Sequence, residues 1–140
     1  MQHPTLRIKH ASLALRRAID TAVAPMGLTA AQFDVVQELL HHDGMKHREL
    51  QRKLSIASPT LTNILDRMEA AELIERHPDP LDARVRRVYL AKATRGLCKT
   101  DQFLNAGREL IEQMFNGVND SDRELFLAVA DRITANLQRE

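Results

Sequence analysis

Apolar residues recur at helical spacing along most of the chain, and the clearest stripe lies near its middle. Four residues there fall at i, i+3, i+4 and i+7: Leu61, Ile64, Leu65 and Met68. This spacing predicts an amphipathic helix whose apolar face points inward. Ser58 is a good N-cap residue and Pro59 suits the first helical position, so the helix should begin there. Thr60, Asn63 and Arg67 then share the opposite face, where they can hydrogen-bond to bases or phosphates.

A β-ribbon is expected directly after this helix. Residues 73–77 and 84–90 predict two short strands, the second rich in alternating β-branched positions, and the turn-rich segment 78–83 joins them. Asp79 and Asp82 lie near the arginines of this segment and could orient them. These arginines are Arg84, Arg86 and Arg87. An arginine held in this way can enter the minor groove of DNA, where the negative potential is high.

Other helices are expected before this pair. Residues 5–23 contain no glycine or proline and form a long amphipathic pattern. Thr29 and Gln32 have the spacing of a capping box for a second helix. The expected core stripe of that helix is Phe33, Val36, Leu39 and Leu40. A third helix should run over about 47–54, and Arg48 at its start could hold a phosphate.

The C-terminal part of the chain is also helical in pattern. Residues 92–115 predict one continuous helix, and Ser121 with Glu124 predicts a capping box for a last helix. Together with 5–23, these helices are too apolar on one side to lie free in water. We expect them to pack together and against a second chain, in a C2 dimer whose recognition helices are roughly 34–36 Å apart. The alternative is a monomer in which they fold back on their own core.

Three segments together resemble the MarR (multiple antibiotic resistance regulator) family of bacterial transcription factors. They are LTAAQFDVVQELL at 28–40, the helix-turn-helix segment at 48–76 and the wing HPDPLDARVRRVYL at 77–90. Within the wing, Asp82 and Arg84 match the D-x-R of the family. The three segments cover nearly half of the chain.

The resemblance implies a mainly α fold with a small β-ribbon (α+β). A winged helix-turn-helix domain would occupy 28–90, and helical dimerisation regions would occupy 1–27 and 91–140. Members of the family bind pseudo-palindromic operators as homodimers, mostly as repressors, and are often released by small aromatic or phenolic ligands or by oxidation. The resemblance places five residues towards the major groove: Ser58, Thr60, Thr62, Asn63 and Arg67. It places Arg84 in the minor groove.

Four features depart from the family's pattern: three single positions, and the family's Leu-Thr-x-x-Gly entry to the next helix, which is blurred over 90–96. Asn63 stands where members often have arginine, so a base preference does not transfer to this chain. Glu72 replaces the usual glycine between the helix and the wing, which predicts a left-handed backbone there or a different helix end. Gln51 stands where a small alanine is common, and it bears on how closely the two helices of the motif pack.

Length and charge suit a DNA-binding domain with dimerising extensions. The chain has 140 residues and a formal net charge of +1. Basic residues outnumber acids over 45–100 and acids dominate 101–140, an asymmetry that steers a polyanion to one face. No apolar run approaches the ~20 residues of a membrane span, residues 1–4 begin no signal peptide, and the single Cys98 suits a reducing compartment. We therefore expect a cytoplasmic protein with no membrane partner.

Signals for an enzyme or a metal site are weak. His41 and His42 are adjacent rather than one turn apart, and the histidines show no ligand spacing with a cysteine or carboxylate. Cys98 lies in a predicted helix without a resolving cysteine, which favours a buried apolar role over redox sensing. No GxSxG, phosphate-binding glycine loop or suggestive Ser, His and Asp set occurs. We expect neither an enzyme nor a bound cofactor or metal.

Two alternatives stay open at this point. The helix and ribbon could belong to a winged-helix module that docks to proteins, although the arginines of the wing argue against it. Arg84→Ala would separate the two functions, because only DNA binding depends on that side chain. A small-molecule effector would lie among parts of 5–23, 28–42 and 92–115, but no residue pattern names a compound.

Overall fold

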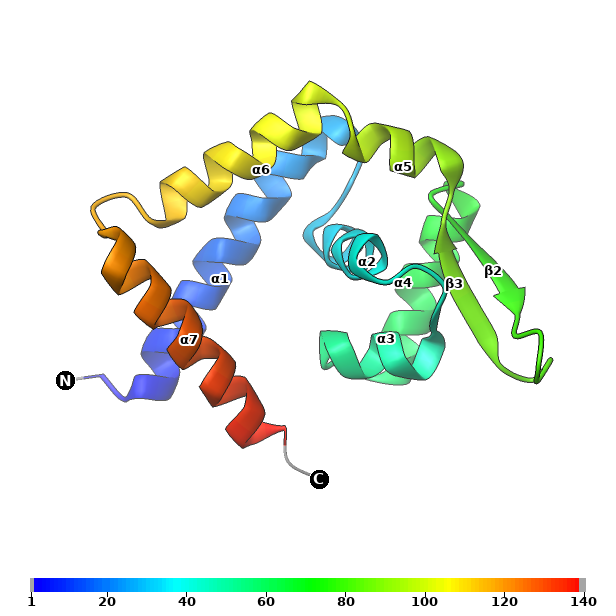
Figure 1. Ribbon diagram of the computed structural model, residues 1–140, viewed down its shortest axis with the longest axis horizontal. Helices are drawn as coiled ribbons and strands as arrows, with labels where there is room; N and C mark the ends of the chain where they lie inside the picture. The colour runs from blue at the N-terminus through cyan, green and yellow to red at the C-terminus, as the bar shows by residue number, and fades with distance from the viewer. Residues whose placement is uncertain (1, 139–140) are drawn as a thin grey trace.

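The computed structural model describes residues 2–138 and shows a mainly helical protein with one small sheet (Figure 1). The helical elements are α1 (Pro4–Val23), the 3-10 turn η1 (Ala24–Met26), α2 (Ala30–His41), α3 (His47–Leu54), α4 (Ser58–Ala70), α5 (Lys92–Cys98), α6 (Asp101–Met114) and α7 (Asp120–Leu137). The strands are β1 (Met45–Lys46), β2 (Ile74–Pro78) and β3 (Arg86–Leu90). The expected α+β class is confirmed. Within residues 2–138, no helix has the length and apolarity needed to cross a bilayer.

The elements form two groups. Figure 1 shows α1, α6 and α7 on one side of the molecule and α2, α3, α4 and the sheet on the other, with α5 leading from β3 to α6. The main core fills the second group and includes Val35, Leu50, Leu65 and Val88, all fully buried. A smaller cluster forms where the end of α1 meets the start of α2. Phe103 packs against both clusters and so links the two groups.

Helix α2 begins as expected and differs from expectation on one face. Thr29 accepts a hydrogen bond from the backbone N–H of Gln32, whose side chain accepts one from the Thr29 N–H, and this confirms the capping box. Val36 and Leu39 are fully buried, whereas Leu40 is 46% exposed and lies outside the core, contrary to the prediction. The buried stripe uses Val35 in its place, because the neighbouring elements cover a different arc of the helix.

The sheet has a third strand that the sequence did not indicate. All neighbours are antiparallel, and β3 lies between β1 and β2. Met45 of β1 pairs with Val88, which is also opposite Arg76 of β2. Side chains alternate between the two faces of a strand, so Val88 and Leu90 point into the core together with Ile74.

The long helix predicted over 92–115 is wrong, because the chain is broken between α5 and α6. Thr100 is the N-cap of α6, and its hydroxyl accepts a hydrogen bond from the Phe103 N–H while donating one to the Leu97 carbonyl. A hydroxyl that satisfies the backbone on both sides favours a new helix start over continuation. Thr94 holds α5 in place, since its buried hydroxyl donates to the Leu73 carbonyl.

Two predicted N-caps are also wrong. Ala57 is the N-cap of α4, so Ser58 occupies the first helical position and Pro59 the second. The N-cap of α7 is Asn119, whose side chain accepts from the Asp122 N–H, and the box predicted from Ser121 and Glu124 is not the cap. In such segments several residues that can act as an N-cap follow one another, and the backbone conformation decides which of them does.

Helices α1, α6 and α7 leave large apolar side chains in water in the single chain. They include Ile8 and Leu13 of α1, Leu104 and Ile111 of α6, and Leu125, Phe126 and Val129 of α7. Helix α7 buries no residue at all. Apolar surface of this extent is unusual for a soluble monomer.

Candidate nucleic-acid interface

One face of α4 is a row of exposed polar side chains. Ser58, Thr60, Thr62, Asn63 and Arg67 are all exposed. The opposite face of the helix is fully buried in the core, which fixes how the exposed row is presented. Hydroxyl, amide and guanidinium groups on one helical face have the chemistry that reads base edges and phosphates.

The tip of the wing holds Arg84 outwards. The Arg84 Nε lies 3.1 Å from Asp82 Oδ1 and its Nη2 lies 3.3 Å from Asp82 Oδ2, and the Arg84 backbone N–H also donates to Oδ1. These hydrogen bonds from Arg84 keep the pKa of Asp82 below its ordinary value. The Arg84 side chain is nevertheless 91% exposed. Asp82 thus orients the guanidinium without covering it.

Asp79 stabilises the turn at the base of the tip by accepting hydrogen bonds. Its buried carboxylate accepts from the backbone N–H groups of Leu81 and Asp82, at 2.7 Å and 3.3 Å. Arg87 donates from Nε to Asp79 at 2.7 Å and from Nη1 to the Gly44 carbonyl at 2.8 Å. The hydrogen bond from Leu81, followed by that from Arg87, lowers the pKa of Asp79. Arg87 is therefore turned into the protein and supports the tip, unlike Arg84.

A groove of about 900 Å³ lies between the start of α3, α4 and the wing. It brings together four of the residues expected from the sequence: Arg48, Thr62, Arg84 and Arg86. It also contains Lys46. His47 and Arg76 line it as well, and sequence reasoning had not assigned these two to the site. Ser58, Thr60, Asn63 and Arg67 do not line it and lie elsewhere on the exposed face of α4. The groove has a strong excess of cationic side chains, which favours a polyanion.

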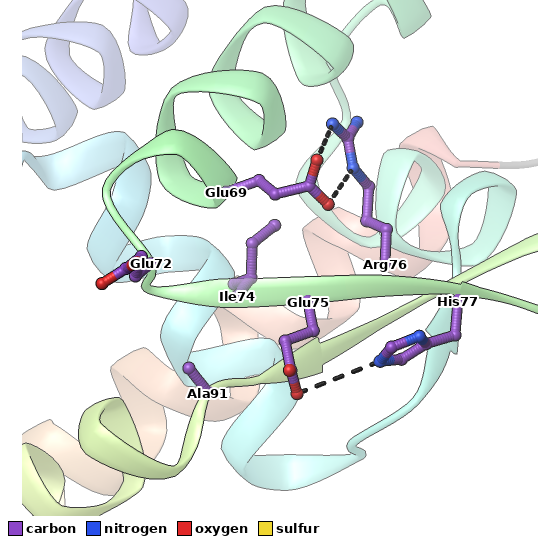
Figure 2. A pocket seen from close by; sticks show the side chains of 7 residues that line it. All are labelled: Glu69, Glu72, Ile74, Glu75, Arg76, His77 and Ala91. Atoms are coloured by element: carbon purple, nitrogen blue, oxygen red, sulfur yellow. Dashed lines mark hydrogen bonds and ion pairs between the residues drawn. The ribbon is translucent and has the colours of Figure 1, made fainter.

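Arg76 is the most constrained cation of this groove. Its Nη2 lies 2.7 Å from Asp66 Oδ1 and 3.0 Å from Glu69 Oε1, and its Nε lies 3.2 Å from Glu69 Oε2. Figure 2 shows the two bonds between Arg76 and Glu69. The hydrogen bond from Arg76 lowers the pKa of Glu69. The i, i+3 spacing of Asp66 and Glu69 was the sequence signal for this ion-pair site. It could not be used without knowing which face of the strand carries Arg76.

His47 contacts the start of α4. Its Nε2 lies 3.2 Å from Ser58 Oγ, so the Ser58 hydroxyl bonds to α3 and does not cap α4. Partial burial, and to a lesser degree the charge of Arg76, lowers the pKa of His47. The neutral imidazole therefore joins the first residues of α3 and α4 at neutral pH.

A second pocket, of about 410 Å³, lies on the other side of Arg76 (Figure 2). Three carboxylates line it, from Glu69, Glu72 and Glu75, and His77 Nε2 lies 3.9 Å from Glu75 Oε2. Its acids would repel phosphates, in contrast to the cationic groove. The edge of β2 is thus the boundary of the surface suited to DNA.

The remaining candidates for chemistry have structural roles. Among residues 2–138, no three His, Cys, Asp or Glu side chains are grouped so as to hold a metal ion. His3 caps α1 by accepting from the Thr5 N–H. Cys98 is buried, and burial raises the pKa of its thiol even though Arg95 lowers it, so the thiol is a small apolar group of the core as predicted.

One part of the region expected for an effector is tightly packed in this structure. A cavity of about 10 Å³ lies between α1, α2 and α6, beside Phe33 and Phe103. The two rings pack with centroids 6.0 Å apart. A space of this size holds at most one water molecule, so ligand binding there requires the helices to move.

Known proteins resemble this chain in both sequence and fold. The model of the MarR family matches residues 28–85. The uncharacterized HTH-type transcriptional regulator YsmB of Bacillus subtilis is 26% identical over 95% of this chain and 87% of its own length. The multiple antibiotic resistance protein MarR of Escherichia coli is 30% identical over 70% of this chain and 67% of its own length.

Solved structures share the fold over nearly the full length. A mutant MarR from E. coli complexed with operator DNA has a TM-score of 0.83 at 24% identity, covering 93% of both chains. A MarR transcriptional regulator from Methanosarcina mazei has a TM-score of 0.84 at 20% identity, covering 94% of both chains.

Proposed function

We propose that this chain, which belongs to the MarR family and is a DNA-binding transcriptional regulator, is a homodimeric repressor that binds a pseudo-palindromic operator. The observation that supports this most is the wing tip, where Asp82 holds a 91% exposed Arg84. A cation fixed in place and left open to water is suited to a minor groove, whose narrow negative channel admits a single guanidinium.

Each part of the surface has a distinct role in the proposed complex. Arg48 at the start of α3 binds phosphate, and the exposed residues of 58–67 read base edges in the major groove. Arg84 enters the adjacent minor groove, and Arg86 supports it from the groove side of β3. Arg87 holds the tip through Asp79. Phosphate contacts fix the register on the duplex, and the helix supplies sequence preference.

In the proposed complex the chain consists of a DNA-binding domain and a dimerisation region. Residues 28–90 form the DNA-binding domain, and 1–27 with 91–140 form the helical dimerisation region. The exposed apolar side chains of α1, α6 and α7 support this assignment, since a second chain would remove them from water. A two-fold axis then places the two α4 helices about one DNA turn apart, roughly 34–36 Å.

Release by a small aromatic or phenolic ligand belongs to the same proposal. The ligand would enter between α1, α2 and α6, where Phe33 and Phe103 now fill the space. It releases DNA only if it binds the opened form more tightly than the DNA-bound form. The protein would act on the chromosome, in the cytoplasm of a bacterial cell.

The test is a salt titration of binding to the chain's own upstream DNA, against a scrambled duplex, with stoichiometry measured in parallel. We expect two chains per native site and an affinity that falls steeply with salt, by about 0.9 in log–log slope per phosphate neutralised. Arg84→Ala should weaken specific binding by about 1–3 kcal/mol. The matched control is Lys99→Ala, which removes one exposed positive charge between α5 and α6. Figure 1 shows that the junction of these two helices lies well away from the tip of the β2–β3 ribbon.

The outcome that contradicts the proposal is equal, weak binding to both duplexes with no effect of Arg84→Ala. That result would favour a winged-helix module that docks to proteins.

A further inference from the structure

Arg76 connects the two parts of the surface that the proposed complex uses. It lies in β2, opposite Val88, and its side chain is only 18% exposed. From there it reaches α4, where it binds both Asp66 and Glu69 at 2.7–3.2 Å. Figure 2 shows its guanidinium turned towards the carboxylate of Glu69. One residue of β2, the strand that leads into the wing, is thereby joined to two residues of α4.

The geometry of these contacts restrains the helix in more than one direction. Asp66 and Glu69 are three residues apart, on one face of α4 and about one turn from each other. The planar guanidinium uses Nε and Nη2 towards Glu69 and Nη2 again towards Asp66. Arg76 thus makes a bidentate contact with Glu69 and a further contact with Asp66, one turn earlier in α4. Contacts with two turns restrain both the distance and the rotation of α4 relative to β2.

The restraint continues from β2 to the tip of the wing. The Arg76 carbonyl accepts a hydrogen bond from Arg86 Nη2 at 3.4 Å, and Arg86 pairs with Pro78 at the end of the ribbon. Arg84 lies two residues before Arg86, in the tip. On the helix side, Arg67 of the exposed row is the neighbour of Asp66.

We propose that Arg76 is a positioning residue for DNA recognition, which sets the distance and rotation between α4 and the wing so that both grooves are engaged at once. The proposal rests on the proposed function, since it concerns how α4 and Arg84 are aligned on one duplex. The wing and α4 can contact two grooves of one DNA duplex at the same time only if they are held at the matching separation. A wing that is not aligned with the duplex loses its contacts.

A simpler effect of Arg76 must be separated from positioning. Arg76 also neutralises two carboxylates on the DNA-binding helix, and its loss would leave them to repel phosphates. Two variants discriminate between these effects. Arg76→Gln removes the cation alone. The triple variant Asp66→Asn, Glu69→Gln, Arg76→Gln removes the carboxylates as well and leaves the chain more positive than the wild type.

We expect Arg76→Gln to weaken specific binding about tenfold, similar to the loss of one base-pair contact. The triple variant should stay weakened to a similar degree, because its added positive charge does not restore the alignment. Wild-type affinity in the triple variant would overturn the proposal and leave charge neutralisation as the only role. Arg76→Lys should bind only slightly better than Arg76→Gln, since an ammonium does not reproduce the bidentate geometry.

Two further readouts test positioning directly. In the Arg84→Ala background, where the wing contact is already lost, Arg76→Gln should leave the slope of log affinity against log salt unchanged, whereas a further decrease of about 0.9 would mean that Arg76 contacts a phosphate, which overturns the proposal. In a double-mutant cycle, Arg84→Ala should weaken binding less in the Arg76→Gln background than in the wild type, because an unaligned Arg84 has less to lose. Additive losses would also overturn it.

A variant at a second arginine ion pair serves as the control for effects on folding. Arg95→Gln breaks the contact between α5 and Asp43, neither of which lines the groove, and should change thermal stability without changing affinity per folded dimer. Affinities are therefore compared per active dimer, counted by stoichiometric titration. If Arg84→Ala weakens binding and Arg76→Gln does not, the positioning proposal alone fails. If neither variant changes binding, the proposed function fails first.

Discussion

Glu72 joins the recognition helix to the wing in a left-handed conformation, with φ of 61°. Its place in the family pattern, where glycine is usual, predicted either this backbone or a different helix end, and the structure shows the first of the two. An L-residue with a side chain pays about 1–2 kcal/mol for such a conformation, whereas glycine adopts it freely. Glu72→Gly should therefore stabilise the protein, offset in part by the greater freedom of glycine in the unfolded chain.

We expect Glu72→Gly to raise the free energy of unfolding by about 0.5–1 kcal/mol in denaturant titrations. Gly44→Ala is the opposite test, because Gly44 has φ of 74° and an added Cβ would lie 2.8 Å from the Tyr89 ring. It should be destabilising. Unchanged stability in Glu72→Gly would show that the side chain compensates for its backbone.

His47 should give folding stability a dependence on pH. Its pKa in the folded protein is below the ordinary 6.5, so the unfolded chain binds the proton first as pH falls. The contribution of the neutral ring is complete above 6.5 and is lost as pH falls from there through the folded pKa. Urea titrations between about pH 8 and pH 5 should show this loss, and His47→Gln should lessen it. An identical pH profile in the variant would contradict the assignment.

The sequence predicted some arginine roles and missed others for a physical reason. Asp82 and Arg84 are two residues apart in a turn, and their pairing follows from local spacing. Arg76 and Arg87 lie in strands, where a shift of one residue in register exchanges the two faces. Only the register shows that Arg76 faces α4 and that Arg87 turns towards Asp79.

At the scale of the elements, the break at Thr100 separates the wing's supporting helix from the apolar helices. Apolar periodicity alone could not reveal it, because α5 and α6 continue one another's stripe without a glycine or proline at the junction. The two-residue strand β1 was similarly invisible, being too short to show alternation. The bounds of α3, in contrast, match the expected 47–54.

The corrected caps lead to a testable difference between two small polar residues. Thr100→Ala removes the cap of α6 and should lower the free energy of unfolding by about 1 kcal/mol. Ser121→Ala, in a position that the sequence pattern had favoured as a cap, should change it by only a few tenths. Thermal melts at one protein concentration compare the two. An equal loss in both variants would contradict the assignment of the caps.

At the scale of the whole molecule, the apolar faces of α1, α6 and α7 should lie between two chains. Val129 of α7 is 46% exposed in the single chain, and a carboxylate there would be buried without a partner in the dimer. Val129→Asp should therefore yield monomers in sedimentation experiments and lose operator binding at concentrations where the wild type is saturated.

The control for this change is Leu81→Asp, which makes a similar apolar-to-acid replacement at a wing residue that is 97% exposed. This variant should remain dimeric. A dimeric Val129→Asp protein would show that α7 is not part of the subunit interface.

The exposed face of α7 also has a consequence for gene dosage. A helix that has no buried residue in the single chain is completed by a second copy in the proposed dimer, so assembly consumes two gene products for each operator occupied. Below the dissociation constant of the dimer, occupancy rises with the square of the copy number, and halving synthesis lowers it to about a quarter. The response of the regulated promoter to the regulator's own abundance would thus be steeper than proportional, without any cooperativity between operators.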